Sequence, residues 1–158
     1  MSVYLSTTTK GEVFVQARAD IVTSLEAFRE ALIGEGTVPN ITGAYPDHAV
    51  TAAITPYATV GLVRADFENY GAGNATYDMQ TRMTCQVFVH TSVAPAIYDE
   101  QQKWDLLNSL YNYYKNLKRI SANFDGLIIV NMEGDVAFPE TGTIGAVFNF
   151  QLWKVVST

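Results

Sequence analysis

The stretch from Met79 to Arg119 constrains the fold most, because a β-prone segment leads into a long amphipathic helix. Residues 79–91 are rich in β-branched and aromatic side chains, which predicts a strand, and residues 92–95 interrupt it at a proline. A helix is then predicted from about Ile97 to Lys118. At about 100° per residue its large apolar side chains lie within an arc of roughly 140°. These are Trp104, Leu107, Leu110, Tyr111, Tyr114 and Leu117, flanked by Leu106 and Tyr113.

A second helix is predicted near the N-terminus, from about Gly11 to Ile33. Thr9 and Glu12 have the spacing of a capping box, and glycines at positions 34 and 36 can end the helix. The apolar residues keep helical spacing: Phe14, Ala17, Ile21, Leu25, Phe28 and Leu32. A short strand at Val13–Val15 is the alternative for the first turn. Residues 1–8 are polar and threonine-rich, and we expect a flexible arm there.

Further strands are predicted at residues 57–67, 127–132 and 143–155, with a short one at 49–54 inside a turn-rich segment. In the final strand Ile144, Phe148 and Leu152 share one face by alternation. The principal elements follow the order α-β-β-α-β-β. This order predicts a single α+β domain over residues 1–158, with two helices packed on a mostly antiparallel four-stranded sheet in two layers.

Two long connections, residues 68–78 and 133–142, are predicted as loops because glycine, asparagine and acidic residues gather there. Loops of this length beside compact elements are typical of interaction surfaces. The candidate interaction residues are Tyr70, Gly71, Gly73, Asn74, Asp135, Phe138 and Glu140.

Charge and cysteine content exclude several classes of protein. A net charge of −6 over 158 residues argues against a direct grip on nucleic acid, which needs clustered lysine and arginine. The single cysteine, Cys85, rules out a disulfide within the chain. The sequence offers no secretory signal and no apolar run of membrane-spanning length, so we expect synthesis in the cytosol and no membrane partner.

No constellation for catalysis is found, and we predict no catalytic, cofactor-binding or metal-binding residues. Cys85 and His90 lie five residues apart on one predicted strand, so their side chains point to opposite faces and cannot pair. His48 is expected in a solvated loop. Asn108, Asn112 and Asn116 follow one another at helical spacing, which fits either a solvated face or amide hydrogen bonds across a subunit contact.

Taken in order, these elements resemble the tail terminator (tail completion) proteins of long-tailed bacteriophages. The resemblance begins with the N-terminal helix and a proline-containing stretch, then a strand opened by Pro56–Tyr57 and a long loop into residues 82–90. It continues through a helix holding Leu106-Leu107-Asn-Ser-Leu110 to a hairpin that closes on Phe148-Asn-Phe-Gln-Leu152. It covers nearly the whole chain.

The resemblance implies a structural protein of the virion without an active site, assembled in the host cytoplasm and placed at the neck end of the tail. It implies a homo-oligomeric ring, usually of six copies, that caps the tail tube protein, stops tube polymerisation and meets the head–tail connector protein. A contractile sheath is a further partner where the tail is contractile, and DNA passes through the lumen without specific binding.

Three other functions stay open. A neighbouring neck or connector subunit would have similar features. A small-molecule-binding or enzymatic α+β domain would place its pocket between sheet and helix, with convergent polar groups, of which the strands offer few. A host cytosolic assembly protein of unrelated role is the third.

Overall fold

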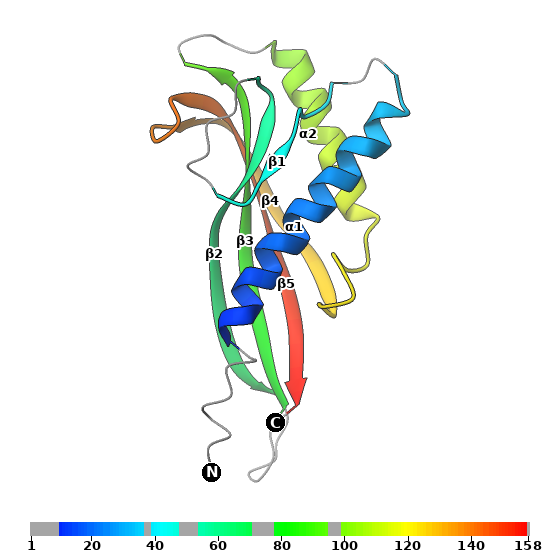
Figure 1. Cartoon of the computed structure of the whole chain (residues 1–158), viewed down its shortest axis with the longest axis vertical. Coiled ribbons are helices and arrows are strands. Elements are labelled where there is room, and N and C mark those ends of the chain that lie inside the picture. The colour runs from blue at the N-terminus through cyan, green and yellow to red at the C-terminus, as the bar shows by residue number, and fades with distance from the viewer. Residues whose placement is uncertain (1–9, 37–38, 48–53, 71–77, 95–98, 158) are drawn as a thin grey trace.

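A computed structural model describes residues 10–36, 39–47, 54–70, 78–94 and 99–157, and it shows two helices and one mixed, mostly antiparallel sheet (Figure 1). The sheet has five strands in the order β1-β2-β3-β5-β4. The elements are α1 (Lys10–Ile33), β1 (Ala44–Tyr45), β2 (Tyr57–Tyr70), β3 (Asp78–Val93), α2 (Glu100–Lys115), β4 (Gly126–Phe138) and β5 (Thr143–Ser157).

The predicted α+β class is confirmed, but the four-stranded sheet and the order α-β-β-α-β-β are wrong because of β1. This strand pairs in parallel with Ala58 and Thr59 of β2, within a segment expected to be irregular. Two residues are too few to carry a readable alternation, so the pattern could not reveal the strand. The short strand expected at residues 49–54 falls largely on residues 48–53, which lie outside the described residues, as do the expected arm (residues 1–8) and His48.

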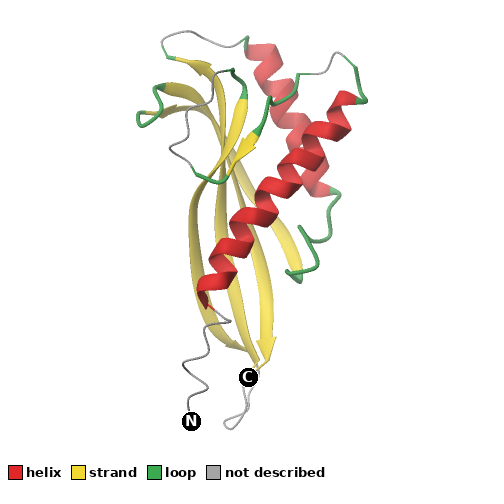
Figure 2. Cartoon of the chain, in the orientation of Figure 1, coloured by secondary structure: helices red, strands yellow, loops and turns green. Residues whose placement is uncertain are grey.

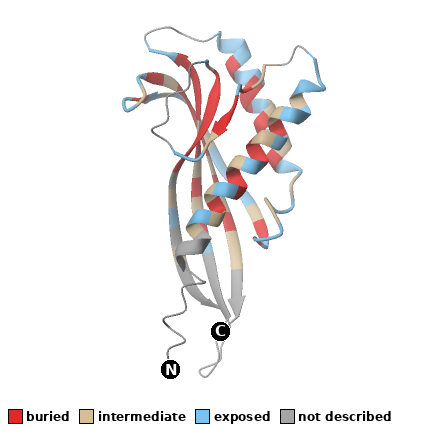
Figure 3. Cartoon of the chain, in the orientation of Figure 1, coloured by how far each residue is buried: buried red, intermediate tan, exposed pale blue. Residues whose placement is uncertain are grey.

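Helix α1 is confirmed to within one residue, and the alternative strand at its first turn is wrong. Its buried face consists of Ala17, Ile21, Leu25 and Phe28, the stripe that helical spacing predicts. The helix crosses the sheet diagonally in Figure 1 and contacts β2 and β1. The opposite face is exposed to solvent (Figure 3).

Helix α2 begins at Glu100, three residues later than predicted, because Asp99 caps it by accepting a hydrogen bond from the Gln102 amide at 3.0 Å. The predicted apolar stripe is also partly wrong. Trp104 and Tyr111 are 47% and 37% exposed. The buried stripe is instead Lys103, Leu106, Leu107, Leu110 and Tyr114. Leu106, expected at the flank, is therefore buried together with the rest of this stripe.

In both hairpins the strands extend further into the connecting segment than the sequence predicts. The expected loop 68–78 is wrong at both ends, since β2 and β3 pair through Tyr70 and Asp78, and residues 71–77 lie outside the described residues. The expected loop 133–142 is wrong for most of its length, because β4 runs to Phe138 and a turn spans only 139–142. Register shifts between Ile129 and Asn131 and between Glu133 and Val136 keep β4 paired with β5 through the irregular sequence.

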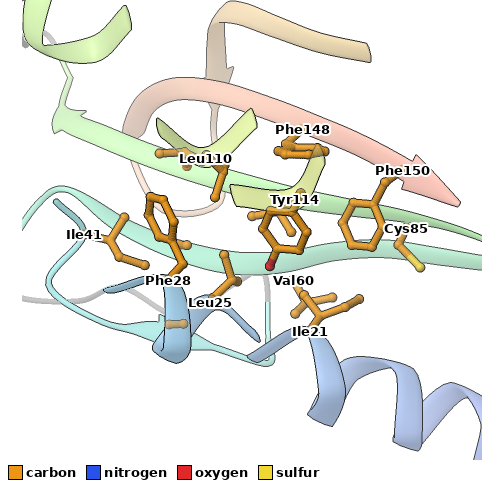
Figure 4. Packing of buried hydrophobic residues seen from close by; sticks show 14 of the residues in the cluster. Ile21, Leu25, Phe28, Ile41, Val60, Cys85, Leu110, Tyr114, Phe148 and Phe150 are labelled. Atoms are coloured by element: carbon orange, nitrogen blue, oxygen red, sulfur yellow. The ribbon is translucent and has the colours of Figure 1, made fainter. Parts of the chain in front are cut away.

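The main core lies between the sheet and the two helices (Figure 4). Alternation in β5 is confirmed, because Ala146, Phe148, Phe150 and Leu152 are all fully buried. Phe148 and Phe150 contact the ring of Tyr114 from α2 at centroid distances of 5.2 and 5.7 Å. Both helices therefore cover the same face of the sheet.

Buried polar contacts fix the two helices to each other. The Ser24 hydroxyl of α1 donates to the Ile21 carbonyl at 2.8 Å and lies 2.5 Å from the Tyr114 hydroxyl of α2. Asp20 accepts hydrogen bonds from Ser121 at 2.6 Å and Asn123 at 3.1 Å, in the turn after α2. These links attach α2 and the turn that follows it to α1.

The strands are long relative to the helices that cover them. At about 3.4 Å per residue, the 14 residues of β2 and 16 of β3 span about 48 and 54 Å. Strands usually have 3–10 residues. In Figure 2 the lower ends of β2, β3 and β5 continue past the start of α1 as a three-stranded extension.

Candidate interaction surface

Strand β4 forms one edge of the sheet. In the described part of the chain it pairs with β5 alone, so alternate backbone N–H and C=O groups on its outer side face away from the sheet. Ile128 and Val130 on this strand are 51% and 50% exposed. The final strand, β5, is not an edge, because it lies between β3 and β4.

A hollow of about 470 Å³ lies beside this edge, between β4 and the C-terminal half of α2. Its lining is mostly apolar or aromatic: Tyr111, Tyr114, Lys115, Leu117, Leu127, Ile129, Val130, Asn131 and Met132. The Lys115 ammonium lies 5.7 Å from the centroid of the Tyr111 ring. The hollow and the open edge together form one surface that suits an apolar side chain arriving beside a strand.

The far end of β4 is held by α2 through a buried cation. The Lys103 ammonium lies 2.5 Å from a carboxylate oxygen of Asp135 and 3.2 Å from one of Glu100. Burial opposes the charge on Lys103, but the two carboxylates outweigh it, and the pKa of Lys103 is raised. A methyl group at Gly134 would lie 2.9 Å from the Trp104 indole, so glycine allows this ring to cover the bulge. The contacts fix the course of the edge strand.

The candidate interaction residues that the structure describes lie in two strands and one turn. Asp135 lies in β4 with a φ of 57°. Phe138, the last residue of β4, is buried, and its ring lies 4.8 Å from that of Phe88. Glu140 is exposed in the turn, and Tyr70 ends β2. Gly71, Gly73 and Asn74 lie outside the described residues. A binding role for these residues stays a prediction.

The opposite edge of the sheet differs from β4. Strand β1 covers only Ala58 and Thr59 of β2, so from Val60 to Tyr70 no described strand pairs with the outer side of β2. Val15 of α1 is 70% exposed. Arg18 of α1 donates to the Pro46 carbonyl at 2.7 Å, next to β1, and so links the helix to this short strand.

His90 lies on the sheet face opposite the helices, in a buried polar and aromatic cluster. Its ring nitrogens lie 2.9 Å from the Thr59 hydroxyl and 2.6 Å from that of Thr143. The ring stacks on Tyr57 at 4.4 Å and contacts Phe138 at 4.6 Å. Burial lowers the pKa of His90 to about 4, so the ring is neutral near pH 7. Each ring nitrogen of His90 has a threonine hydroxyl as its hydrogen-bond partner, so the contacts of this side chain are those of a structural residue.

Cys85 lies on the helix face of the sheet with Met83, Val87 and Val89, all buried. The predicted separation from His90 on the other face is confirmed. Burial raises the pKa of the Cys85 thiol to about 12, which removes its nucleophilic form near neutral pH. In the ranges that the structure describes, no three histidine, cysteine, aspartate or glutamate side chains come together to hold a metal ion.

The predicted asparagine face of α2 is exposed. Asn108, Asn112 and Asn116 all face outward, and the Asn116 amide donates to the Asn112 carbonyl at 2.9 Å. The face is therefore accessible to water and to a neighbouring molecule alike. Neither described helix combines the length and apolar character that crossing a membrane requires.

Sequence reasoning missed the surface made by α2 and β4. The signal was the run Leu127–Val130, which is apolar on both faces of its strand although the strand lies at an edge. No protein-family model matches the chain, and no curated protein matches it significantly.

Proposed function

We propose that the chain is a tail terminator of a long-tailed bacteriophage. It forms a ring, of six copies in the related architecture, that caps the tail tube, stops its polymerisation and joins the head connector in the virion. Two kinds of argument support this proposal. The order of the elements and their residue patterns resemble those of that family. The sheet also has two unlike edges, which a ring subunit could use to contact its two neighbours.

The observation that carries the proposal is the difference between the two edges of the sheet. One edge is β4 with its exposed Ile128 and Val130 and the adjoining hollow, and the other is the outer side of β2. An exposed edge strand with apolar side chains favours pairing with another chain. Because the two edges are unlike, a contact between them is head-to-tail, and head-to-tail contacts close into rings when the rotation allows.

The long strands support a second role, contact along the axis of the tail. The extension of β2, β3 and β5 beyond α1 provides a narrow projection at one end of the subunit (Figure 2). In the proposed ring it reaches toward the tail tube, while the opposite end faces the connector. Six copies at −6 each carry about −36, a charge that repels DNA in a lumen rather than retaining it. A neighbouring neck subunit would use the same surfaces differently.

A small-molecule-binding domain is the second candidate, and the hollow beside α2 favours it. Its volume of about 470 Å³ lies within the range of ligand pockets, roughly 300–1,000 Å³. Its lining offers few polar groups to orient a ligand, chiefly Lys115, Asn131 and the Tyr111 hydroxyl. Thermal melts of the purified chain against a metabolite library separate the two functions, since a terminator is stabilised by tail tube and not by metabolites.

The direct test is tube polymerisation. Purified tail tube protein is grown into tubes with and without the chain, and tube length and tube ends are measured by negative-stain microscopy. We expect growth to stop and a density cap to appear at one end of each tube. The Cys85→Ala variant should cap the tubes as the parent chain does. Unchanged tube growth at saturating chain would refute the proposal.

A further inference from the structure

The end of α2 concentrates positive charge on a chain that is acidic as a whole. Three of the ten lysine and arginine residues lie between positions 115 and 119: Lys115, Lys118 and Arg119. No aspartate or glutamate occurs in the sequence between Asp105 and Asp125. The three cations are exposed, and among the described residues no carboxylate forms a salt bridge with any of them. Their charge is therefore available to an anionic partner.

These cations adjoin the hollow between α2 and β4. Lys115 and Leu117 are part of its lining, and Lys118 follows directly along the chain. The β4 side of the hollow is largely apolar and includes Leu127, Ile129 and Met132. Asp20, which contacts the turn after α2, is buried and already accepts hydrogen bonds from that turn. The site thus combines an apolar hollow with a cationic rim.

We propose that this site binds a peptide segment of another protein, in which a large apolar side chain is flanked by carboxylates. The apolar side chain enters the hollow of about 470 Å³, and the carboxylates meet Lys115 and the cations that follow it. Apolar anchors in a pocket supply much of the affinity of such contacts, and the charges supply specificity. Binding here does not require a ring. Ile128, which alternates to the other face of β4, stays available to a neighbouring copy.

Charge and lining favour a peptide over nucleic acid as the occupant. A chain of net charge −6 repels a long polyanion, and binding to phosphates depends on many clustered cations. Of the nine described residues that line the hollow, Lys115 alone is charged. An acidic peptide needs only a few cations, and its apolar side chain accounts for the hollow as well.

The experiment titrates fluorescent nonapeptides with the full chain and follows their anisotropy at low salt. Three peptides have a central phenylalanine flanked on both sides by glutamate, glutamine or lysine, and a fourth has serine between glutamates. We expect the peptide with phenylalanine and glutamate to bind about tenfold more tightly than its glutamine counterpart, and more tightly than the other two. Added salt should weaken it. Equal affinity for the glutamate and glutamine peptides, tightest binding of the lysine peptide, or no binding of any peptide would overturn the proposal.

Charge reversal then locates the binding. Lys115→Glu should weaken binding of the phenylalanine and glutamate peptide about fivefold or more. Arg64→Glu is the matched control, because it changes the net charge equally at an exposed position of β2, and it should leave the affinity unchanged. Both variants should melt like the parent, since both side chains are exposed. Equal weakening by the two variants would show an effect of net charge alone and would overturn the site.

A labelled double-stranded oligonucleotide tests the other class of polyanion. The chain should bind it more weakly than the phenylalanine and glutamate peptide. Tighter binding of the oligonucleotide, lost in Lys115→Glu, would assign the cations to phosphates and overturn the peptide site. Tube capping is measured without these peptides, so failure of this site and failure of the proposed function are separate results.

Discussion

The hydrogen bond between Ser24 and Tyr114 predicts an unequal response to mutation of its two partners. A serine hydroxyl has one proton, and Ser24 donates it to the Ile21 carbonyl. The Tyr114 hydroxyl must therefore be the donor in the contact of 2.5 Å between them. Tyr114→Phe removes this bond and leaves no buried donor unpaired, so it should lower the free energy of unfolding by about 1 kcal/mol.

Ser24→Ala should be more destabilising, because it leaves the hydroxyl of a buried tyrosine without an acceptor. Such a group adds a desolvation penalty, and we expect a loss of about 2 kcal/mol. The double variant removes both partners, so it should be no less stable than Ser24→Ala alone. The resulting coupling energy between the two sites is about 1 kcal/mol.

The assay is urea unfolding followed by circular dichroism, at a chain concentration where light scattering shows monomers. Ser24→Gly is unsuitable as a control, since it also changes helix propensity. Thr23→Ala, one residue earlier on the exposed face of α1, is the matched control and should change stability little. Equal and additive effects of the two single variants would refute the assignment of donor and acceptor.

Three further predictions concern buried positions. Cys85→Ala should fold and assemble, and the native thiol should resist a thiol reagent at pH 8 because its pKa is about 12; rapid labelling with loss of assembly would contradict this. His90 has a pKa of about 4 when folded against 6.5 when unfolded, so the unfolded chain binds the proton first and stability should fall as pH drops from about 6.5 toward 4. His90→Gln should flatten that part of the urea-stability profile, and a profile with unchanged slope would count against it. Gly145→Ala should destabilise by about 3 kcal/mol or more, because its methyl would lie 1.8 Å from the Val89 carbonyl oxygen, whereas Gly34→Ala should be tolerated; equal melting temperatures would show that the backbone yields.

Periodicity predicted the parts of the fold where one face is buried over many residues. The α1 stripe and the alternation of β5 are of this kind, and Ala17, Phe148 and Leu152 are buried as expected. The α2 stripe differs from the prediction because two of its aromatic residues, Trp104 and Tyr111, are partly exposed. Trp104 instead covers Gly134 at the rim, and the cation of Lys103 takes a buried position because Asp135 pairs with it across the structure.

The extent of the hairpins could not be predicted from local sequence. Glycine and acidic residues at 133–135 predict a loop, yet pairing with β5 and a residue in the left-handed region carry β4 through them. The surface between α2 and β4 also depends on which strand lies at the edge. That order is a property of the whole topology, and the sequence signal at Leu127–Val130 becomes informative only once it is known.

The measurement that tests the account most directly is native mass spectrometry of the chain, alone and with tail tube protein, with negative-stain imaging of the same samples. The account predicts one closed ring, of six copies in the related architecture, formed alone or on the tube. An exclusively monomeric species under both conditions would contradict it. A closed two-fold dimer would contradict it equally, because the two unlike sheet edges require a head-to-tail contact.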